Sequence, residues 1–310
     1  MKDPIGSYPF VEPACLMMRV DLSGKVALVT GVGDNVGFAW HIAKALQAAG
    51  ARLVFACHPR LVGIVESIME RDADADSRIL PFGAGSLQVE KIFACDVSYD
   101  TMDDVDQKTK EDKRFAKHGD FSIQGLVNNL TASGYTGVDI LIHAVAFSPE
   151  IKNKLSDTSR SAYRTSLDIS AYSMIGLLKA LDPMMANRNG GASAVGLTYL
   201  GGERVVPHYG GGMSTAKAAL QMDAKVLAAN LGSKGIRVNC VSAGPYASRA
   251  ARAIGDIDDM IKHAADRSPL QRAIEADEVG YATAFLCSPL ASAITGQILY
   301  VDCGYNVIGV

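Results

Sequence analysis

A tyrosine and a lysine mark the segment of this sequence that is best suited to chemistry. Tyr209 is followed by three glycines, and seven residues separate it from Lys217. Each glycine costs a helix about 1 kcal/mol relative to alanine, so we expect a helix to begin near Ser214, with Tyr209 on the loop before it. A nearby ammonium favours the ionised phenol, and the three donors of a lysine suit ribose hydroxyls. The pair is therefore predicted to stabilise a developing oxyanion and to hold a ribose.

A glycine-rich turn supplies a second candidate site. The apolar run from Val26 to Thr30 is followed by Gly31, Gly33 and Gly37, and then by a helical pattern. Glycines let a backbone approach a pyrophosphate closely, and the first turn of the next helix offers unpaired N–H groups. The spacing departs from Gly-x-Gly-x-x-Gly, so its place between a strand and a helix carries the interpretation. A turn that only reverses the chain is the alternative.

Short apolar runs and the helices between them would position these residues. Seven strands are predicted, at residues 26–30, 52–56, 91–95, 138–144, 194–198, 236–241 and 297–301. The first is followed by a helix predicted for residues 39–49. Continuously apolar strands that alternate with helices indicate a parallel sheet covered on both faces. We expect a Rossmann-like, doubly wound α/β fold, with residues 1–20 as an N-terminal extension and residues 21–310 as one dinucleotide-binding domain.

The residues that follow the strands are candidates because doubly wound folds bind ligands at the carboxyl ends of their strands. His58 and Arg60 follow the second run, where such folds carry an acid for the adenosine ribose or a basic residue for a 2'-phosphate. No acid is present there and Arg60 directly follows Pro59, so NADH and NADPH both stay open. Asp96 and Val97 follow the third run and are placed to flank an adenine, although Asp96 also suits a turn cap.

Composition narrows the classes of partner. The net charge is -3 with both signs spread along the chain, so nucleic acid is not expected to bind. The six cysteines form no Cys-x-x-Cys pair and the six histidines have no ligand spacing, which favours buried free thiols in a reducing compartment and no metal site. Residues 279–301 carry no charge, but Pro289 and Gly296 interrupt them, so a buried helix and strand are expected rather than a membrane span.

The segment from Tyr199 to Lys217 resembles the active-site stretch of enoyl-acyl-carrier-protein reductases, in particular their plastid-type branch. In both, one tyrosine stands ten positions before a second tyrosine, which begins the sequence Tyr-Gly-Gly-Gly-Met-Ser. Ordinary short-chain dehydrogenases place three residues between tyrosine and lysine. The likeness runs from Asp21 to Gly309 and includes the insertion around Lys113-Arg114-Phe115.

The resemblance implies a role for each residue. Tyr209 would hydrogen-bond the thioester carbonyl and stabilise the enolate formed when hydride reaches the β-carbon, Lys217 would bind the nicotinamide ribose, and Tyr199 would line the acyl pocket. The cofactor would be bound by Gly31, Val32, Gly33, Gly37, Phe38, His58, Asp96, Val97, Ala144, Val145, Ala146, Leu197, Lys217, Ala243, Gly244, Pro245 and Ser248. The substrate would be bound by Tyr199, Tyr209, Met213, Ala250, Ala251 and Ile254, the last three on a lid helix where ordinary packing is the alternative.

The resemblance also implies the reaction and its setting: NADH-dependent reduction of the trans-2 double bond of enoyl thioesters on acyl carrier protein, the last step of type II fatty acid elongation. A homotetramer in a plastid stroma or a bacterial cytoplasm is expected. Two departures concern the cofactor, because the branch usually has Trp where this chain has His58, and Ser-Leu-Ala-Asn where it has Ala144 to Phe147. The alternatives are a short-chain dehydrogenase that acts on a ketone or alcohol, and a non-enzymatic nucleotide-binding relative.

Overall fold

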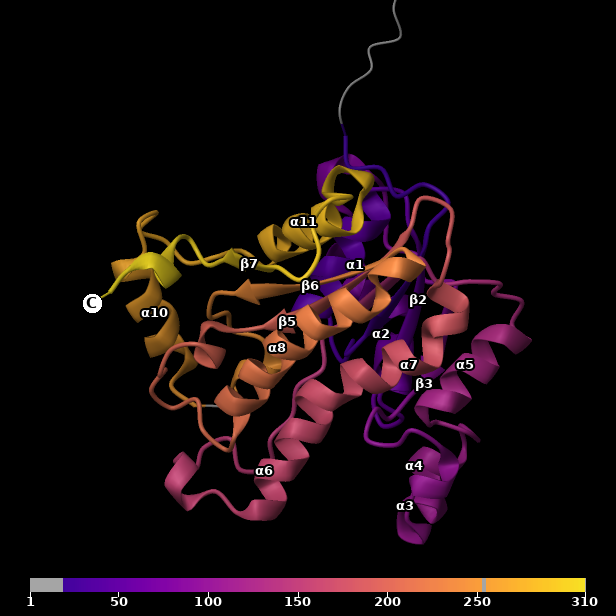
Figure 1. The fold of residues 1–310 in the computed structure, drawn as a ribbon, viewed down its shortest axis with the longest axis horizontal. Coiled ribbons are helices and arrows are strands. Elements are labelled where there is room, and N and C mark those ends of the chain that lie inside the picture. Colours follow the sequence, from indigo (N-terminus) through magenta and orange to yellow (C-terminus); the bar gives the residue numbers. More distant parts are fainter. Residues whose placement is uncertain (1–18, 253–254, 310) are drawn as a thin grey trace, which may run out of the picture.

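A single parallel sheet of seven strands organises the molecule, and the computed structural model describes it within residues 19–252 and 255–309. The strand order is β3-β2-β1-β4-β5-β6-β7, with every neighbouring pair parallel (Figure 1). The strands are β1 Val26–Thr30, β2 Arg52–Cys57, β3 Lys91–Ala94, β4 Ile140–His143, β5 Ala192–Thr198, β6 Ile236–Ala243 and β7 Ile298–Val301. The predicted seven-stranded, doubly wound α/β fold is confirmed.

Helices connect the strands. They are α1 Phe38–Ala48, α2 Val62–Glu70, α3 Gln107–Glu111, α4 Lys113–Ala116, α5 Ile123–Ala132, α6 Arg160–Leu167, α7 Ser173–Met185, α8 Met213–Leu231, α9 Arg249–Arg252, α10 Ile257–Arg267 and α11 Ala276–Cys287. A π-helical turn, Asp168–Tyr172, joins α6 to α7. The helix predicted near Ser214 is α8, which begins one residue earlier, and Tyr209 lies on the loop before it.

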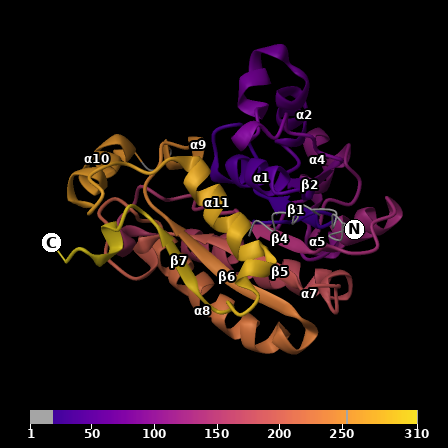
Figure 2. The ribbon, with the colours of Figure 1, turned by 90° about the horizontal axis from the view of Figure 1, so that it is seen from above.

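Two apolar layers hold the helices against the sheet. Ala27 and Val29 of β1 pack in one core with α1, α2 and α11, whereas Leu28 packs in a second core with α5, α7 and α8. The two groups of helices lie on opposite sides of the sheet (Figures 1 and 2). Successive side chains of a strand point to opposite faces, so a strand covered on both faces must be apolar at every position. This requirement explains the unbroken apolar run at residues 26–29.

The strand order reverses between β1 and β4, and this reversal opens a crevice at the carboxyl ends of the strands. Gly31 directly follows β1 with a φ of +81°, and a Cβ on it would overlap the carbonyl oxygen of Ala144, which follows β4. A side chain would therefore be strained there and would also push the two strand ends apart. Glycine keeps the floor of the crevice closed at this point.

The uncharged stretch at residues 279–301 divides as expected into a helix and a strand. It covers most of α11, a turn over Pro289–Ala291 and all of β7. Val279 and Leu286 of α11 are buried against α1 and the sheet. Within the residues that the structure describes, no helix has the length and apolar character needed to cross a membrane.

Candidate active site

One cavity of about 890 Å³ opens at the carboxyl ends of the strands. Its walls come from the segments that follow β1, β2, β3, β4, β5 and β6, together with the first turns of α1 and α8. Segments far apart in the sequence therefore meet at the edge of the sheet where doubly wound folds bind nucleotides. The size is within the range of small-molecule and cofactor sites.

The cavity brings together nearly all of the predicted site residues. Every residue of the predicted cofactor set lines it, from Gly31 after β1 to Ser248 after β6. Of the predicted substrate set, Tyr199, Tyr209, Met213 and Ala251 line it as well. Ile254 and the side chain of Ala250 lie outside the described part of the structure. The two predicted sets thus share one continuous space.

Lys217 enters this cavity from α8, where it is only 4% exposed. Its Nζ donates a hydrogen bond of 2.7 Å to the carbonyl oxygen of Leu197, near the end of β5. Burial lowers the pKa of the Lys217 ammonium to about 8. The single protein acceptor leaves N–H donors for a ligand, because an ammonium carries three.

Tyr209 is held over the cavity by a loop that only glycines can form. Gly211 and Gly212 have φ values of +59° and +79°, and a Cβ on either would collide with neighbouring atoms. The carbonyl oxygen of Gly211 accepts hydrogen bonds from the hydroxyls of Ser148, at 2.8 Å, and Ser166, at 2.7 Å. The three glycines therefore do more than precede the start of α8, because they let the loop pack closely on α6 and on the segment before it.

The expected effect of Lys217 on Tyr209 is wrong for this structure. Burial, with the nearby phenol of Tyr199, raises the pKa of Tyr209 instead of lowering it. Lys217 does not contribute to that shift, and its ammonium is bonded to Leu197. Tyr209 is therefore a neutral proton donor at physiological pH.

The glycine-rich turn after β1 carries an acid that the sequence analysis missed. Asp34 lines the cavity, and its Oδ1 accepts hydrogen bonds from the N–H groups of Val36, at 3.0 Å, and Gly37, at 2.7 Å. Its Oδ2 lies 3.7 Å from Nε of Arg249, which begins α9. Asp34 thus shapes the turn before α1 and links it to the segment that covers the cavity.

The segment beside the cavity contains a short helix at the place predicted for the lid helix, and a second helix follows it among the described residues. The short α9 carries Ala251 and ends at Arg252, and α10 begins at Ile257. Ile257 and Met260 line the cavity from the first turn of α10, and the sequence analysis missed both. Their spacing of three residues places them on one helix face, which is the signal that could have identified them.

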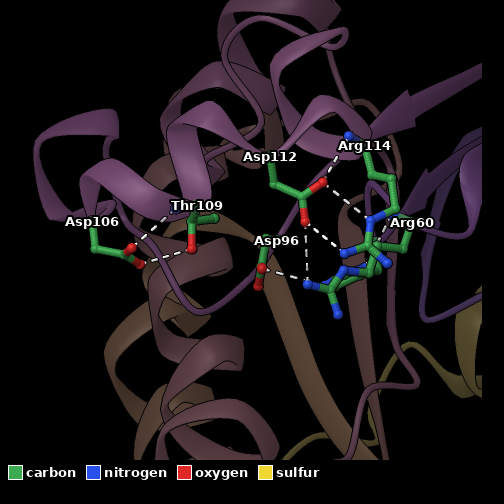
Figure 3. A network of polar contacts seen from close by, with 7 residues as sticks. Arg60, Asp96, Asp106, Thr109, Asp112 and Arg114 are labelled. Carbon is green, nitrogen blue, oxygen red and sulfur yellow. Dashed lines mark hydrogen bonds and ion pairs between the residues drawn. The ribbon is translucent and has the colours of Figure 1, made fainter.

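The far loops, after β2 and β3, form a polar end of the cavity (Figure 3). Nδ1 of His58 accepts from the backbone N–H of Arg60 at 3.2 Å, so its Nε2 carries the proton and faces Oδ2 of Asp96 at 3.3 Å. Burial raises the pKa of Asp96, but hydrogen bonds from His58 and Ser98 outweigh it and leave that pKa below its usual value. The imidazole and an ionised carboxylate therefore lie together here.

A segment between β3 and α5 closes this end. Thr109 of α3 and Phe115 of α4 line the cavity, and neither was predicted as a site residue. The ring of Phe115 meets the ring of His58 edge to face, with centroids 5.4 Å apart. Phe115 is buried in the structure, but its neighbours in the sequence are charged. The composition of this segment therefore gave no sign of its burial.

These features fit a dinucleotide. The crevice offers a glycine turn at a helix start for a pyrophosphate, a buried lysine with spare donors for a ribose, and a ring beside a carboxylate for an adenosine. Among the described residues, no group of three or more His, Cys, Asp or Glu side chains could hold a metal ion. The arrangement suits hydride chemistry on an oxygen-bearing substrate beside Tyr209.

Comparison with known proteins gives one family. The family model described as Enoyl-(Acyl carrier protein) reductase matches residues 84–306. The chain is 43% identical to the chloroplastic enoyl-[acyl-carrier-protein] reductase [NADH] of Arabidopsis thaliana, over 94% of this chain and 74% of that protein.

Two solved structures share the fold. One is the Plasmodium berghei enoyl-acyl-carrier-protein reductase with triclosan, with a TM-score of 0.86 and 38% identity over 92% of this chain and 98% of that one. The other is the Bacillus cereus enoyl-acyl carrier protein reductase with NADP+ and indole naphthyridinone, with a TM-score of 0.76 and 32% identity over 94% of this chain and 100% of that one. The chain therefore belongs to the enoyl-acyl-carrier-protein reductase family.

Proposed function

We propose that this protein reduces the trans-2 double bond of an enoyl thioester carried by acyl carrier protein, with NADH as the reductant. The observation that carries the proposal is the meeting of Tyr209, Lys217 and Tyr199 in the wall of one cavity that also contains the glycine turn. Family membership supports it, because relatives at 43 to 44% identity are named as NADH-dependent enoyl reductases.

In this reaction Tyr209 stabilises the charge that develops on the substrate. When bound, the nicotinamide supplies a hydride to the β-carbon of the substrate. The phenol of Tyr209 is neutral, because its pKa is raised by burial, so it donates a hydrogen bond to the thioester carbonyl oxygen. That bond strengthens as negative charge moves onto the oxygen, which lowers the energy of the transition state more than that of the bound substrate. The resulting enolate then takes up a proton from solvent at its α-carbon, so that one hydride and one proton together saturate the double bond.

Lys217 and Tyr199 position the reactants. Lys217 is anchored to the Leu197 carbonyl and directs its remaining N–H donors to the ribose of the cofactor. Tyr199 packs on Tyr209 and lines the cavity where the acyl chain enters, together with Met213 and Met260. These apolar walls exclude water from the carbonyl and strengthen the hydrogen bond from Tyr209.

A ketone reductase is the second candidate, since the same tyrosine could donate to a carbonyl that accepts the hydride directly. The Tyr199–Tyr209 ring pair favours the enoyl substrate, because it fills the space around the phenol with an apolar wall suited to an extended acyl chain. The third candidate, a non-enzymatic nucleotide-binding relative, is disfavoured by the intact Tyr209 and Lys217 in the cavity.

One assay separates the candidates. The absorbance of NADH, and then of NADPH, is followed with crotonyl thioester and with a β-ketoacyl thioester. We expect nucleotide oxidation with the crotonyl compound alone. Oxidation with only the ketone would replace the enoyl assignment by the ketone reductase, and nucleotide binding without turnover of either would favour the non-enzymatic relative.

We also propose that residues 21–310 act as one reductase domain that assembles as a homotetramer. The unbroken parallel sheet supports the single domain, and the tetramer follows the resemblance to the plastid-type branch. Sedimentation of the purified chain tests the assembly, because a monomer has a mass of 32.8 kDa and a tetramer sediments as about four times that mass.

For the compartment we propose a plastid stroma in a eukaryote and the cytoplasm in a bacterium. Several relatives are named as chloroplastic. Free thiols also suit a reducing compartment: four of the described cysteines are buried, Cys303 is partly exposed, and burial raises the pKa of Cys57 to about 12. Microscopy of a tagged full-length chain in its own cell tests this.

A further inference from the structure

Three charged residues cluster at the polar end of the cavity. Arg60 follows β2, and Asp112 and Arg114 come from the segment between β3 and α5 (Figure 3). Nη2 of Arg60 lies 3.6 Å from Oδ2 of Asp112. Arg60 lines the cavity, so its contact with Asp112 bears directly on what the cavity accepts.

A second contact restricts Arg60. Its guanidinium carbon lies 5.1 Å from the centre of the Phe115 ring, within the range of a cation–π interaction. Phe115 is itself buried and packs on Phe121, with ring centroids 5.1 Å apart. The half-exposed side chain of Arg60 therefore lies between a buried ring and a carboxylate.

Asp112 is fixed and ionised. Its Oδ1 accepts from the backbone N–H of Arg114 at 2.9 Å and so caps α4. Its two oxygens also accept from the guanidinium of Arg114, at 3.1 Å and 2.7 Å. These hydrogen bonds, with the charge of Arg60, hold the pKa of Asp112 far below its usual range. A permanent negative charge therefore stands beside Arg60.

This charge matters for the choice of nucleotide. In dinucleotide folds, an arginine after the second strand is the residue that accommodates a 2'-phosphate. The other lysine and arginine side chains that line the cavity are Lys217 of α8 and Arg249 of α9. Arg60 is thus the basic residue that the loop after β2 offers at the adenosine end. A phosphate that approaches it must compete with Asp112 and is repelled by it.

We infer that Asp112 is a specificity-determining residue, which holds Arg60 and thereby favours NADH over the 2'-phosphorylated NADPH. The inference rests on the proposed function, because it places the adenosine ribose beside the loop after β2. Family membership leaves the choice of nucleotide to local residues, since one relative is named for NADH and the Bacillus cereus structure is described with NADP+. Asp112 and Arg60 are such residues here.

The test removes the charge of Asp112 and keeps its capping role. Asp112→Asn retains a side-chain oxygen for the N–H of Arg114, and asparagine caps helices as well as aspartate does. Asp106→Asn is the matched control, because Asp106 caps α3 through the N–H of Thr109 at 3.0 Å and its side chain bonds only Thr109 among the described residues. The ratio of kcat/KM for NADPH to that for NADH is measured for both variants with crotonyl thioester.

We expect Asp112→Asn to raise this ratio about fivefold, the upper range for an exposed ion pair, and Asp106→Asn to leave it unchanged. Adding Arg60→Ala to Asp112→Asn should return the ratio to the wild-type value. An unchanged ratio in Asp112→Asn, or an equal rise in Asp106→Asn, would overturn the inference.

Calorimetric titration with each nucleotide, without acyl substrate, makes the result independent of turnover. We expect wild type to bind NADH more tightly than NADPH, and Asp112→Asn to narrow the difference by the same factor of about five. Tight binding of both nucleotides with no effect of Asp112 would refute the specificity role and leave the proposed function standing. Failure of wild type to bind either nucleotide would refute both.

Discussion

The rings of Tyr199 and Tyr209 meet edge to face, with centroids 5.0 Å apart and an angle of 70° between their planes. Gly201 leaves the room for this contact, because a Cβ there would lie 2.7 Å from a ring carbon of Tyr209. Both tyrosines are partly buried, and this burial raises the pKa of both phenols. Each phenol therefore stays protonated at neutral pH.

Tyr209→Phe tests the role of the phenolic hydroxyl of Tyr209. Removing the hydroxyl takes away the hydrogen bond to the thioester oxygen but leaves the ring packed on Tyr199. We expect kcat to fall about a hundredfold or more, the usual contribution of a positioned proton donor, while the dissociation constant for NADH stays within about twofold. Steady-state kinetics and nucleotide titration measure the two quantities.

Tyr199→Phe is the comparison for Tyr209→Phe, since it keeps the ring pair and removes the neighbouring hydroxyl. If Tyr199 only lines the acyl pocket, its variant should change KM for the thioester more than kcat. Equal turnover of Tyr209→Phe and wild type would remove Tyr209 from the reaction. A larger loss of kcat in Tyr199→Phe would indicate that Tyr199, and not Tyr209, donates the hydrogen bond to the thioester oxygen.

Lys217→Met should weaken nucleotide binding and change the dependence of stability on pH. Burial lowers the pKa of Lys217 from 10.5 to about 8, so between these values the unfolded chain binds more protons than the folded protein. Stability contributed through this group therefore rises as pH increases from about 8 towards 10.5. Relative to Lys217→Met, wild type should gain about 2 kcal/mol between pH 7 and pH 9.5.

Urea denaturation of both proteins at the two pH values measures this difference, in which the other titrating groups cancel. Lys217→Arg serves as the second variant, because it keeps a cation and donors at the same place. Parallel stability curves for wild type and Lys217→Met would show that the ammonium is not desolvated. Unchanged NADH affinity in Lys217→Met would remove Lys217 from the ribose site.

The sequence was most informative where residues are buried on both sides of the sheet. All seven predicted strands are present, and the errors are confined to their ends, where most bounds differ from the prediction by one or two residues and two strands extend through a buried serine. Ser193 belongs to β5 and Ser242 to β6, although both were left outside the predicted strands. The Ser193 hydroxyl donates to the Leu286 carbonyl at 3.4 Å, a tertiary contact that an apolar run cannot reveal.

The sequence predicts which residues line the site, but not their pKa shifts or their hydrogen-bond partners. Strand order brings the residues after the strands to one edge, so position in the sequence is enough to place Gly31, Asp96 and Tyr209 in one cavity. The direction of a pKa shift depends on desolvation by the whole fold, and the partner of Lys217 proved to be a backbone carbonyl. Phe115 was missed because a single apolar residue in a charged segment has no periodicity.

His143 offers a second test of buried charge, on the acid side. It ends β4, its Nε2 lies 2.7 Å from the hydroxyl of Ser173, and that hydroxyl donates to the Ile169 carbonyl, also at 2.7 Å. The hydroxyl must therefore accept from Nε2, and Nδ1 is left buried without a partner in the described structure. Burial, and then the charge of Lys217, lowers the pKa of His143 to about 3.

His143→Gln should therefore stabilise the protein selectively in acid. Between pH 6.5 and about 3 the unfolded chain protonates this histidine and the folded protein does not, so stability falls as pH falls through that window. Glutamine can still donate to Ser173 and does not titrate. Wild type should lose about 2 to 3 kcal/mol relative to the variant between pH 7 and pH 4.5 in urea denaturation. A constant difference would mean that His143 has the same pKa in the folded protein as in the unfolded chain.

Gly31→Ala tests the closure of the crevice floor against a glycine with similar backbone geometry. Gly24 has a φ of +78° and nothing within 4 Å of a Cβ, so Gly24→Ala should cost only the strain of a left-handed alanine, about 1 to 2 kcal/mol. Gly31 has a φ of +81°, and its added methyl would also overlap the Ala144 carbonyl. Its loss of unfolding free energy should exceed that of Gly24→Ala by about 2 kcal/mol or more.

The same substitution should also damage the site, since relief of the overlap requires the ends of β1 and β4 to separate. We expect NADH affinity to fall in Gly31→Ala and to stay at the wild-type value in Gly24→Ala, measured by titration at a temperature where both variants are folded. Equal stability losses in the two variants would show that the end of β4 yields to a methyl group. The tight approach of Gly31 to Ala144 would then not be what fixes the shape of the nucleotide crevice.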